Sequence, residues 1–186
     1  MDLLILVDSS LHLGFTRTEL VAGVADGRHG GPALRGALTM ADGRAESAWE
    51  TLLRLFHVVC EVPVVPQFEV RSPDGDFVAR GDLWIRGTRV LHEYDGGVHR
   101  DRDQHRSDLA RDRRLSAAGW TRRGYTAVDL LRRPDQILRE ADSALSRPHD
   151  PARLERWFDL LRESTLSSTG MARLRARWKL PPRPHA

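Results

Sequence analysis

Apolar residues recur at helical spacing in one long segment of this chain and alternate with polar residues in several short ones. The clearest pattern predicts a helix at 46–60, where apolar side chains three and four residues apart form one stripe. Strands are predicted at 63–70, 77–86 and 89–94, the last two joined by a Gly87-Thr88 turn. Further helices are predicted at 2–12, 17–26, 32–41, 103–118, 134–145 and 151–164, and a further strand at 120–126. This order predicts an α/β fold with a mixed central sheet of about four strands flanked by helices.

Composition narrows the class of protein. The chain has 186 residues and a formal net charge of +3, and all but one of its 29 Lys and Arg residues are Arg. Arginine suits phosphate recognition, although a preference for Arg codons would give the same composition. The single cysteine, Cys60, excludes an internal disulfide and a Cys-based zinc site. No signal peptide or membrane-spanning segment is predicted, so we expect a cytoplasmic protein without a membrane partner.

The pattern also predicts three parts in the chain. Residues 1–45 are predicted to form an N-terminal helical linker segment, and residues 46–146 the domain that holds the sheet. Residues 147–186 are predicted to form a basic helical C-terminal extension with a disordered, Pro-rich end.

The hairpin at 77–94 contains the most informative residues. Folding its arms about Gly87-Thr88 places Asp82 directly opposite Glu93 on one face. Facing residues of an antiparallel pair have Cβ atoms roughly 4.5–5.5 Å apart, where like charges are destabilising. Two such carboxylates need protonation, a cationic partner or a divalent metal ion. The metal interpretation indicates a nuclease, whereas a purely structural hairpin would pair its acids with arginine.

Two more residues near the end of this hairpin are candidates for the site. Asp95 follows Glu93 on the same face, and Arg80 across the ladder is its expected ion-pair partner if Asp95 is only structural. Gly96-Gly97 then brings His99 close to the strand end. His99 is a candidate proton carrier that positions or deprotonates water, or protonates the leaving oxygen. The alternative is an ordinary surface histidine.

The order and spacing of these residues resemble a known family. The chain is similar to the small actinobacterial proteins of an uncharacterised family related to very-short-patch-repair (Vsr-like) endonucleases, within the PD-(D/E)XK or restriction-endonuclease-like superfamily. The resemblance covers roughly 46–140 and rests on Ser47-x-x-Glu50-x-x-x-Arg54, Asp82, Glu93-Tyr94-Asp95-Gly96-x-x-His99 and Asp108-x-x-Arg111-Asp112-x-x-Leu115-x-x-x-Gly119-Trp120.

The resemblance implies a restriction-endonuclease-like core and a role for each acid. Asp82 would be the metal-binding acid and Glu93 the second acid, while Glu50 would complete the site from the helix. Glu46 is the alternative to Glu50. Asp95 stands where the superfamily has a lysine, and the repair-endonuclease relatives, which also lack this lysine, are thought to use histidine, which favours His99.

Together these features predict a Mg²⁺-dependent (or Mn²⁺-dependent) DNA endonuclease. Asp82, Glu93 and one backbone carbonyl would hold the ion, and arginines of the 103–118 helix would contact the DNA backbone, namely Arg111, Arg113 and Arg114. The alternative is a catalytically inactive nucleic-acid-binding or partner-binding module on the same fold.

Overall fold

The helices and strands follow the predicted order. The computed structural model describes residues 1–23, 30–96 and 102–179, the side chains of 102–106 excepted, so the end predicted to be disordered lies outside the described residues. The elements are α1 (Asp2–His12), α2 (Arg17–Ala22), α3 (Gly31–Met40), α4 (Ala48–Val59), β1 (Val64–Arg71), β2 (Phe77–Ile85), β3 (Val90–Tyr94), α5 (Arg102–Ala117), β4 (Thr121–Tyr125), α6 (Ala127–Arg132), α7 (Pro134–Ala144), the 3₁₀ turn η1 (Pro151–Leu154), α8 (Glu155–Glu163) and α9 (Ser168–Trp178).

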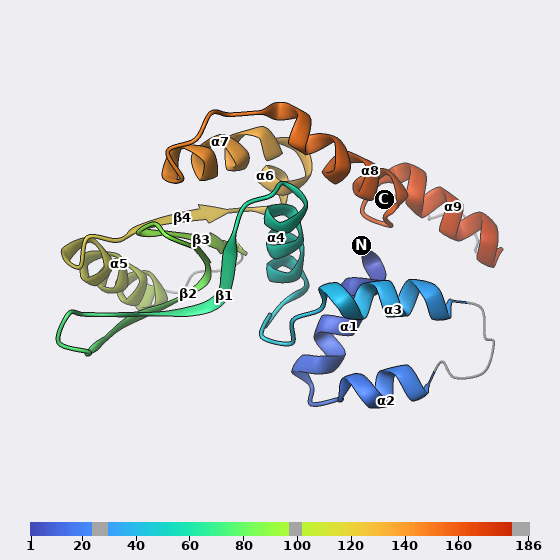
Figure 1. The fold of residues 1–186 in the computed structure, drawn as a ribbon, viewed down its shortest axis with the longest axis horizontal. Helices are drawn as coiled ribbons and strands as arrows, with labels where there is room; N and C mark the ends of the chain where they lie inside the picture. Colours follow the sequence, from blue (N-terminus) through green and yellow to red (C-terminus); the bar gives the residue numbers. More distant parts are fainter. Residues whose placement is uncertain (24–29, 97–101, 180–186) are drawn as a thin grey trace.

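The four strands form one mixed sheet in the order β1-β2-β3-β4. Strand β2 is antiparallel to β1 and to β3, whereas β3 and β4 are parallel. A parallel pair needs a long crossover, and α5 supplies it between β3 and β4. The sheet lies between α5 on one side and α4 with the other helices on the opposite side (Figure 1). The predicted α/β class and four-stranded mixed sheet are confirmed.

The main hydrophobic core lies between the sheet and α4. Leu53 and Phe56 of α4, Leu83 and Ile85 of β2, and Trp157 of α8 are all buried there. Helices α1, α3, α6, α7 and α8 pack around the same core. Segments distant in sequence therefore bury one continuous apolar volume, with α4 near its centre (Figure 1).

Helix α4 begins at Ala48 because Ser47 caps it. The Ser47 hydroxyl accepts a hydrogen bond of 3.2 Å from the N–H of Glu50, which satisfies a free donor of the first turn. Every residue from Thr51 to His57 is buried, so the middle of α4 is covered on all sides. The predicted helix at 46–60 is thus confirmed, with its start two residues later.

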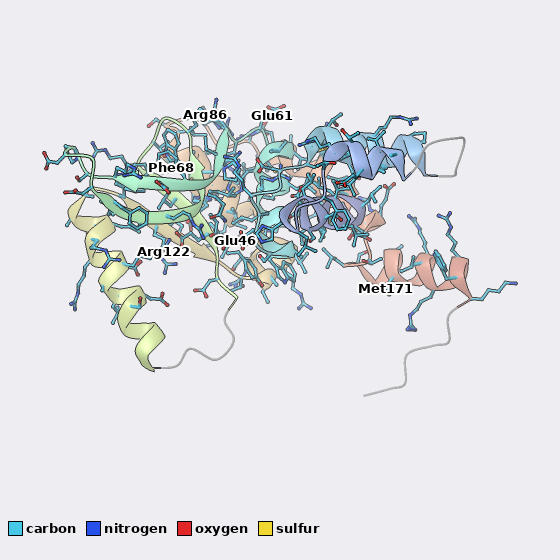
Figure 2. All side chains as sticks on the ribbon, turned by 90° about the horizontal axis from the view of Figure 1, so that it is seen from below. Glu46, Glu61, Phe68, Arg86, Arg122 and Met171 are labelled. Atoms are coloured by element: carbon cyan, nitrogen blue, oxygen red, sulfur yellow. The ribbon has the colours of Figure 1, made fainter. Side chains whose placement is uncertain are left out.

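Two elements after the sheet differ from the predictions. Helix α6 was not predicted, although Thr126 and Asp129 form a capping box that signals its start. The predicted helix at 151–164 is divided into η1 and α8. Helix α9 follows within the predicted basic helical C-terminal extension, and it extends away from the rest of the chain (Figure 2).

A buried ion pair attaches the N-terminal helices to α4. Arg54 of α4 donates to Asp8 of α1 at 2.8 Å and to the carbonyl of Met40 at 2.8 Å. The Asp8 carboxylate also accepts from the Thr51 hydroxyl at 2.9 Å and from the N–H of Asp42 at 2.7 Å. Both charged side chains are almost fully buried, so each depends on the other for neutralisation.

Removing one member of this pair should be costly. We expect Arg54→Met to lower the free energy of unfolding by about 3–5 kcal/mol, because it leaves the Asp8 charge buried and unpaired. The matched control is Arg162→Met, which breaks an exposed pair with Asp159 and should cost less than about 1 kcal/mol. Urea unfolding of both variants measures the difference, and equal losses would contradict this account.

Candidate carboxylate site on the β2–β3 hairpin

The β2–β3 hairpin has the predicted register. Leu83 pairs with His92 and Trp84 with Leu91, and continuing this register brings Asp82 opposite Glu93. The regular ladder ends before that pair, because the Asp82 Oδ2 accepts a hydrogen bond of 2.8 Å from the N–H of Tyr94. The Asp82 side chain therefore extends along the sheet toward β3.

Strand β2 changes face at Asp82, contrary to the regular alternation that was expected. Ala79 packs in a second, smaller hydrophobic core between the sheet and α5. Leu83 and Ile85 instead lie in the main core on the α4 side. Residues four apart in a regular strand share a face, so the strand must be irregular between them. The β1–β2 pairing passes over Asp82 and Gln67, and Gln67 has a left-handed φ of 51°. Regular alternation predicts that Asp82 shares one face with Val78, Arg80 and Trp84, while Phe77, Ala79, Leu83 and Ile85 share the other. That prediction is wrong, because Ala79 and Leu83 lie in different cores.

Helix α4 places Glu50 beside this irregular point. The Glu50 Oε2 accepts from Gln67 Nε2 at 2.9 Å and from the N–H of Glu46 at 2.9 Å. Glu46 instead forms a surface ion pair of 2.7 Å with Arg80. Of the two candidate helix carboxylates, Glu50 is thus the one held toward the strands.

The surroundings of Asp82 disfavour its charge. The pKa of Asp82 is raised to about 7, chiefly by burial and also by the negative charges of Glu50 and Glu93, against the opposing effects of the Tyr94 N–H and Arg111. Carboxylates from α4, β2 and β3 are therefore close enough to influence one another.

Glu93 is neutralised by two arginines. Its side chain is buried, and Arg111 of α5 donates to both of its carboxylate oxygens, from Nη1 to Oε2 at 2.9 Å and from Nη2 to Oε1. Arg122 of β4 donates to Oε2 at 3.1 Å and to Asp112 at 2.8 Å, and it lies beside α5 (Figure 2). Arginine pairing, the alternative to a metal ion, is thus present at Glu93.

The polar sequence of β4 is explained by this contact. Arg122 faces a buried acid, so the strand needs a basic residue where an apolar one is typical. Burial works against the charge of Arg122, while Glu93, Asp112 and Asp95 raise its pKa. Sequence analysis missed Arg122, whose only signal was this unusual polarity.

The other predicted site residues have different outcomes. Arg80, the expected partner of Asp95, forms an ion pair with Glu46. The backbone N–H of Asp95 donates to Tyr125 at 2.7 Å. On α5, Arg113 and Arg114 are exposed, and Arg114 donates to the Val78 carbonyl at 3.3 Å. His99 lies outside the described residues.

An aromatic pair beside the acids was also missed by sequence analysis. Trp49, next to Glu50, stacks on Tyr94, next to Glu93, with ring centroids 5.3 Å apart and planes 5° from parallel. This contact joins the start of α4 to the end of β3. It therefore helps to fix the two elements that carry Glu50 and Glu93.

The acid set suits a hard divalent cation by its chemistry, since Mg²⁺ and Mn²⁺ prefer carboxylate oxygens. Asp82 and Glu93 would hold such an ion, with Glu50 nearby. Within the described ranges, however, no three His, Cys, Asp or Glu side chains gather closely enough to hold one. Both oxygens of Glu93 are engaged by arginine in the present arrangement.

A buried hydrogen-bonded chain supports the hairpin from the other face. His57 of α4 donates from Nδ1 to the Leu53 carbonyl at 2.7 Å, and its Nε2 lies 2.9 Å from Nδ1 of His92. The Tyr125 hydroxyl is 3.2 Å from Nε2 of His92 and donates to Glu140 at 2.8 Å. Neutral imidazoles satisfy the bond to the Leu53 carbonyl and the bond between the two rings, and burial lowers the pKa of His57 to about 4.

Comparisons with known proteins do not identify this chain. No protein-family model, curated protein or solved structure matches it significantly. No helix in the described ranges has the length and apolar character needed to cross a membrane. Function must therefore be inferred from the site itself.

Replacing the Asp82 charge should stabilise the unliganded fold. Asp82→Asn keeps an oxygen for the Tyr94 N–H and removes a buried charge that Glu50 and Glu93 repel, so we expect a gain on the order of 2 kcal/mol at pH 8. Thermal and urea unfolding measure this gain. Asp76→Asn, in the exposed β1–β2 turn, is the control and should be neutral. A destabilised Asp82→Asn protein would show that its charge is well compensated.

Acid should weaken the fold through His57. Its folded pKa of about 4 lies below the usual 6.5, so the unfolded chain binds the proton first as the pH falls. This contribution is complete above about pH 6.5 and lost progressively toward pH 4, by on the order of 3 kcal/mol. Urea unfolding between pH 7.5 and 4.5 should therefore show a smaller decline for His57→Gln than for the wild type. Parallel declines would refute this role.

Proposed function

We propose that this chain is a metal-dependent DNA endonuclease that hydrolyses phosphodiester bonds at the carboxylate site. One observation carries the proposal: the buried Glu93 of β3 lies opposite Asp82 of β2 in the hairpin register, and the negative charges of Glu93 and of Glu50 of α4 both act on Asp82. Burial with like charges raises the free energy of the folded chain, and such arrangements are typical of functional sites.

Asp82 and Glu93 would hold Mg²⁺ or Mn²⁺, together with one backbone carbonyl. A bound ion of this kind supplies an activated water and neutralises charge that develops on a phosphate. Glu50 is held in place by Gln67 and adds negative charge that favours the cation. Asp95, in the position of the usual lysine, cannot donate a proton when ionised, so His99 is the proposed proton carrier.

The arginines around the acids would bind the DNA backbone. Arg111 and Arg122 lie at Glu93. Arg113 and Arg114, which follow Arg111 closely in α5, are exposed. Guanidinium groups bind phosphate through paired N–H donors. The order of elements from α4 to β4 is compatible with the restriction-endonuclease-like core that the resemblance implies, which supports the same proposal.

A second candidate function is a catalytically inactive module that binds nucleic acid or another partner on this fold. The observation that favours it is the complete engagement of Glu93 by Arg111 and Arg122. Such a module would bind its partner without needing a metal ion. Metal dependence therefore separates the two candidates.

Cleavage of supercoiled plasmid DNA with Mg²⁺ or Mn²⁺ tests the proposal. We expect Asp82→Asn to lower the rate at least about a hundredfold, because a direct metal ligand is lost. Glu46→Gln is the matched control, since Glu46 pairs with Arg80 at the surface and should leave the rate unchanged.

Undiminished cleavage by Asp82→Asn would refute the assignment of the site. Metal-independent DNA binding by the wild type, with no cleavage under any condition, would instead support the inactive module. Fluorescence anisotropy with a labelled duplex, with and without Mn²⁺, provides that second measurement.

A further inference from the structure

Helix α9 is basic and contains no acidic residue. Its cationic positions all lie in its second half and at its C-cap, namely Arg173, Arg175, Arg177 and Lys179. Arg173 and Arg177 are exposed, and among the described residues neither forms an ion pair. Residues four apart are neighbours on one side of a helix, where like charges are destabilising. This side of α9 therefore presents a local positive charge to solvent.

The first turn of α9 is held against α8 and α1. The buried Ser164 hydroxyl and the N–H of Thr165, at 2.8 Å, both donate to the carboxylate of Asp2. Gly170 lies so close to the Ser164 carbonyl that a Cβ atom at this position would overlap its oxygen. The rest of α9 extends away from the body of the molecule (Figure 2). Its arginines are thus carried on an anchored helix that projects from the fold.

The distribution of charge around α9 favours a nucleic acid over a membrane surface. A helix that lies in a membrane interface has a broad apolar face opposite its cations. At about 100° per residue, Arg175 lies on the side of α9 opposite Arg173 and Arg177. The apolar positions form only a narrow stripe between them, namely Met171, Leu174 and Trp178. Cations on two sides of a projecting helix suit the phosphates of a polyanion, which guanidinium groups bind through paired N–H donors.

We propose that α9 is a second nucleic-acid contact, which binds the phosphate backbone of duplex DNA through Arg173 and Arg177. The inference rests on the proposed function for the identity of the partner, but not on the chemistry at the carboxylates. Helices α5 and α9 lie at opposite ends of the longest dimension of the molecule (Figure 1). The two helices would therefore hold a duplex at separated points, and α9 would add affinity without reading base sequence.

The test measures how DNA binding by the full-length protein depends on salt. Fluorescence anisotropy is recorded with a labelled duplex of about 30 base pairs, which spans about 100 Å. We expect Arg173→Gln/Arg177→Gln to reduce the slope of log K against log salt by about 2, because two phosphate contacts are lost. The Kd at about 0.15 M salt should rise about tenfold.

Two further variants separate charge at α9 from net charge and from folding. Arg133→Gln/Arg139→Gln removes two exposed arginines that are each paired with an aspartate four residues earlier, and it should leave the slope unchanged. Arg173→Lys/Arg177→Lys keeps both charges and should retain most of the slope, which a structural role of the guanidinium groups would not allow. Urea unfolding shows that each variant is folded.

The outcomes distinguish this inference from the proposed function. A wild-type slope in Arg173→Gln/Arg177→Gln would overturn the role of α9 and leave the nuclease intact. Reduced binding by this variant, in a protein that never cleaves DNA, would support α9 and refute the nuclease. Absence of DNA binding by the wild type would overturn both. Binding to phosphatidylglycerol vesicles that this variant loses, with unchanged DNA binding, would overturn the inference in favour of a membrane surface.

Discussion

The need to neutralise carboxylates in a poorly hydrated interior determines much of this structure. Glu93 is buried in the middle of the sheet, and Asp82 and Glu50 add negative charge beside it. A buried carboxylate without a partner costs several kcal/mol, so basic groups must approach from other elements. Arg111 does so from α5 and Arg122 from β4. The presence of Arg111 in α5 and of Arg122 in β4 follows from this one requirement.

Helix α4 connects the carboxylate site to the rest of the molecule through polar contacts with α1, β1 and β3. Its first turn carries Glu50, its middle holds Arg54 against Asp8 of α1, and His57 on a further side contacts His92 of β3. Each polar contact is buried, so its geometry is fixed by the cost of leaving a donor or acceptor unpaired. The relative positions of α4 and β3, and hence of Glu50 and Glu93, therefore depend on contacts on both faces of the sheet.

The features predicted correctly from the sequence are those governed by local rules. A short turn fixes hairpin register, so the approach of Asp82 to Glu93 was predictable, and apolar periodicity located α4. The face change of β2 was not predictable, because it accompanies a left-handed backbone at Gln67 in a different strand. The pairing of Glu93 with Arg111 and Arg122 was not predictable either, since the fold brings together residues 18 and 29 positions apart in the chain.

Stability alone does not explain why these acids are present. Well-packed apolar residues often replace a buried ion pair with no loss of stability, so Glu93 and its arginines are not required to hold the sheet together. Asp82 is even harder to explain by stability, because burial and two neighbouring carboxylates raise its pKa and make its charged form unfavourable. A side chain that opposes folding in this way is explained by a ligand that compensates it. In the proposed nuclease, that ligand would be a divalent cation at Asp82 and Glu93.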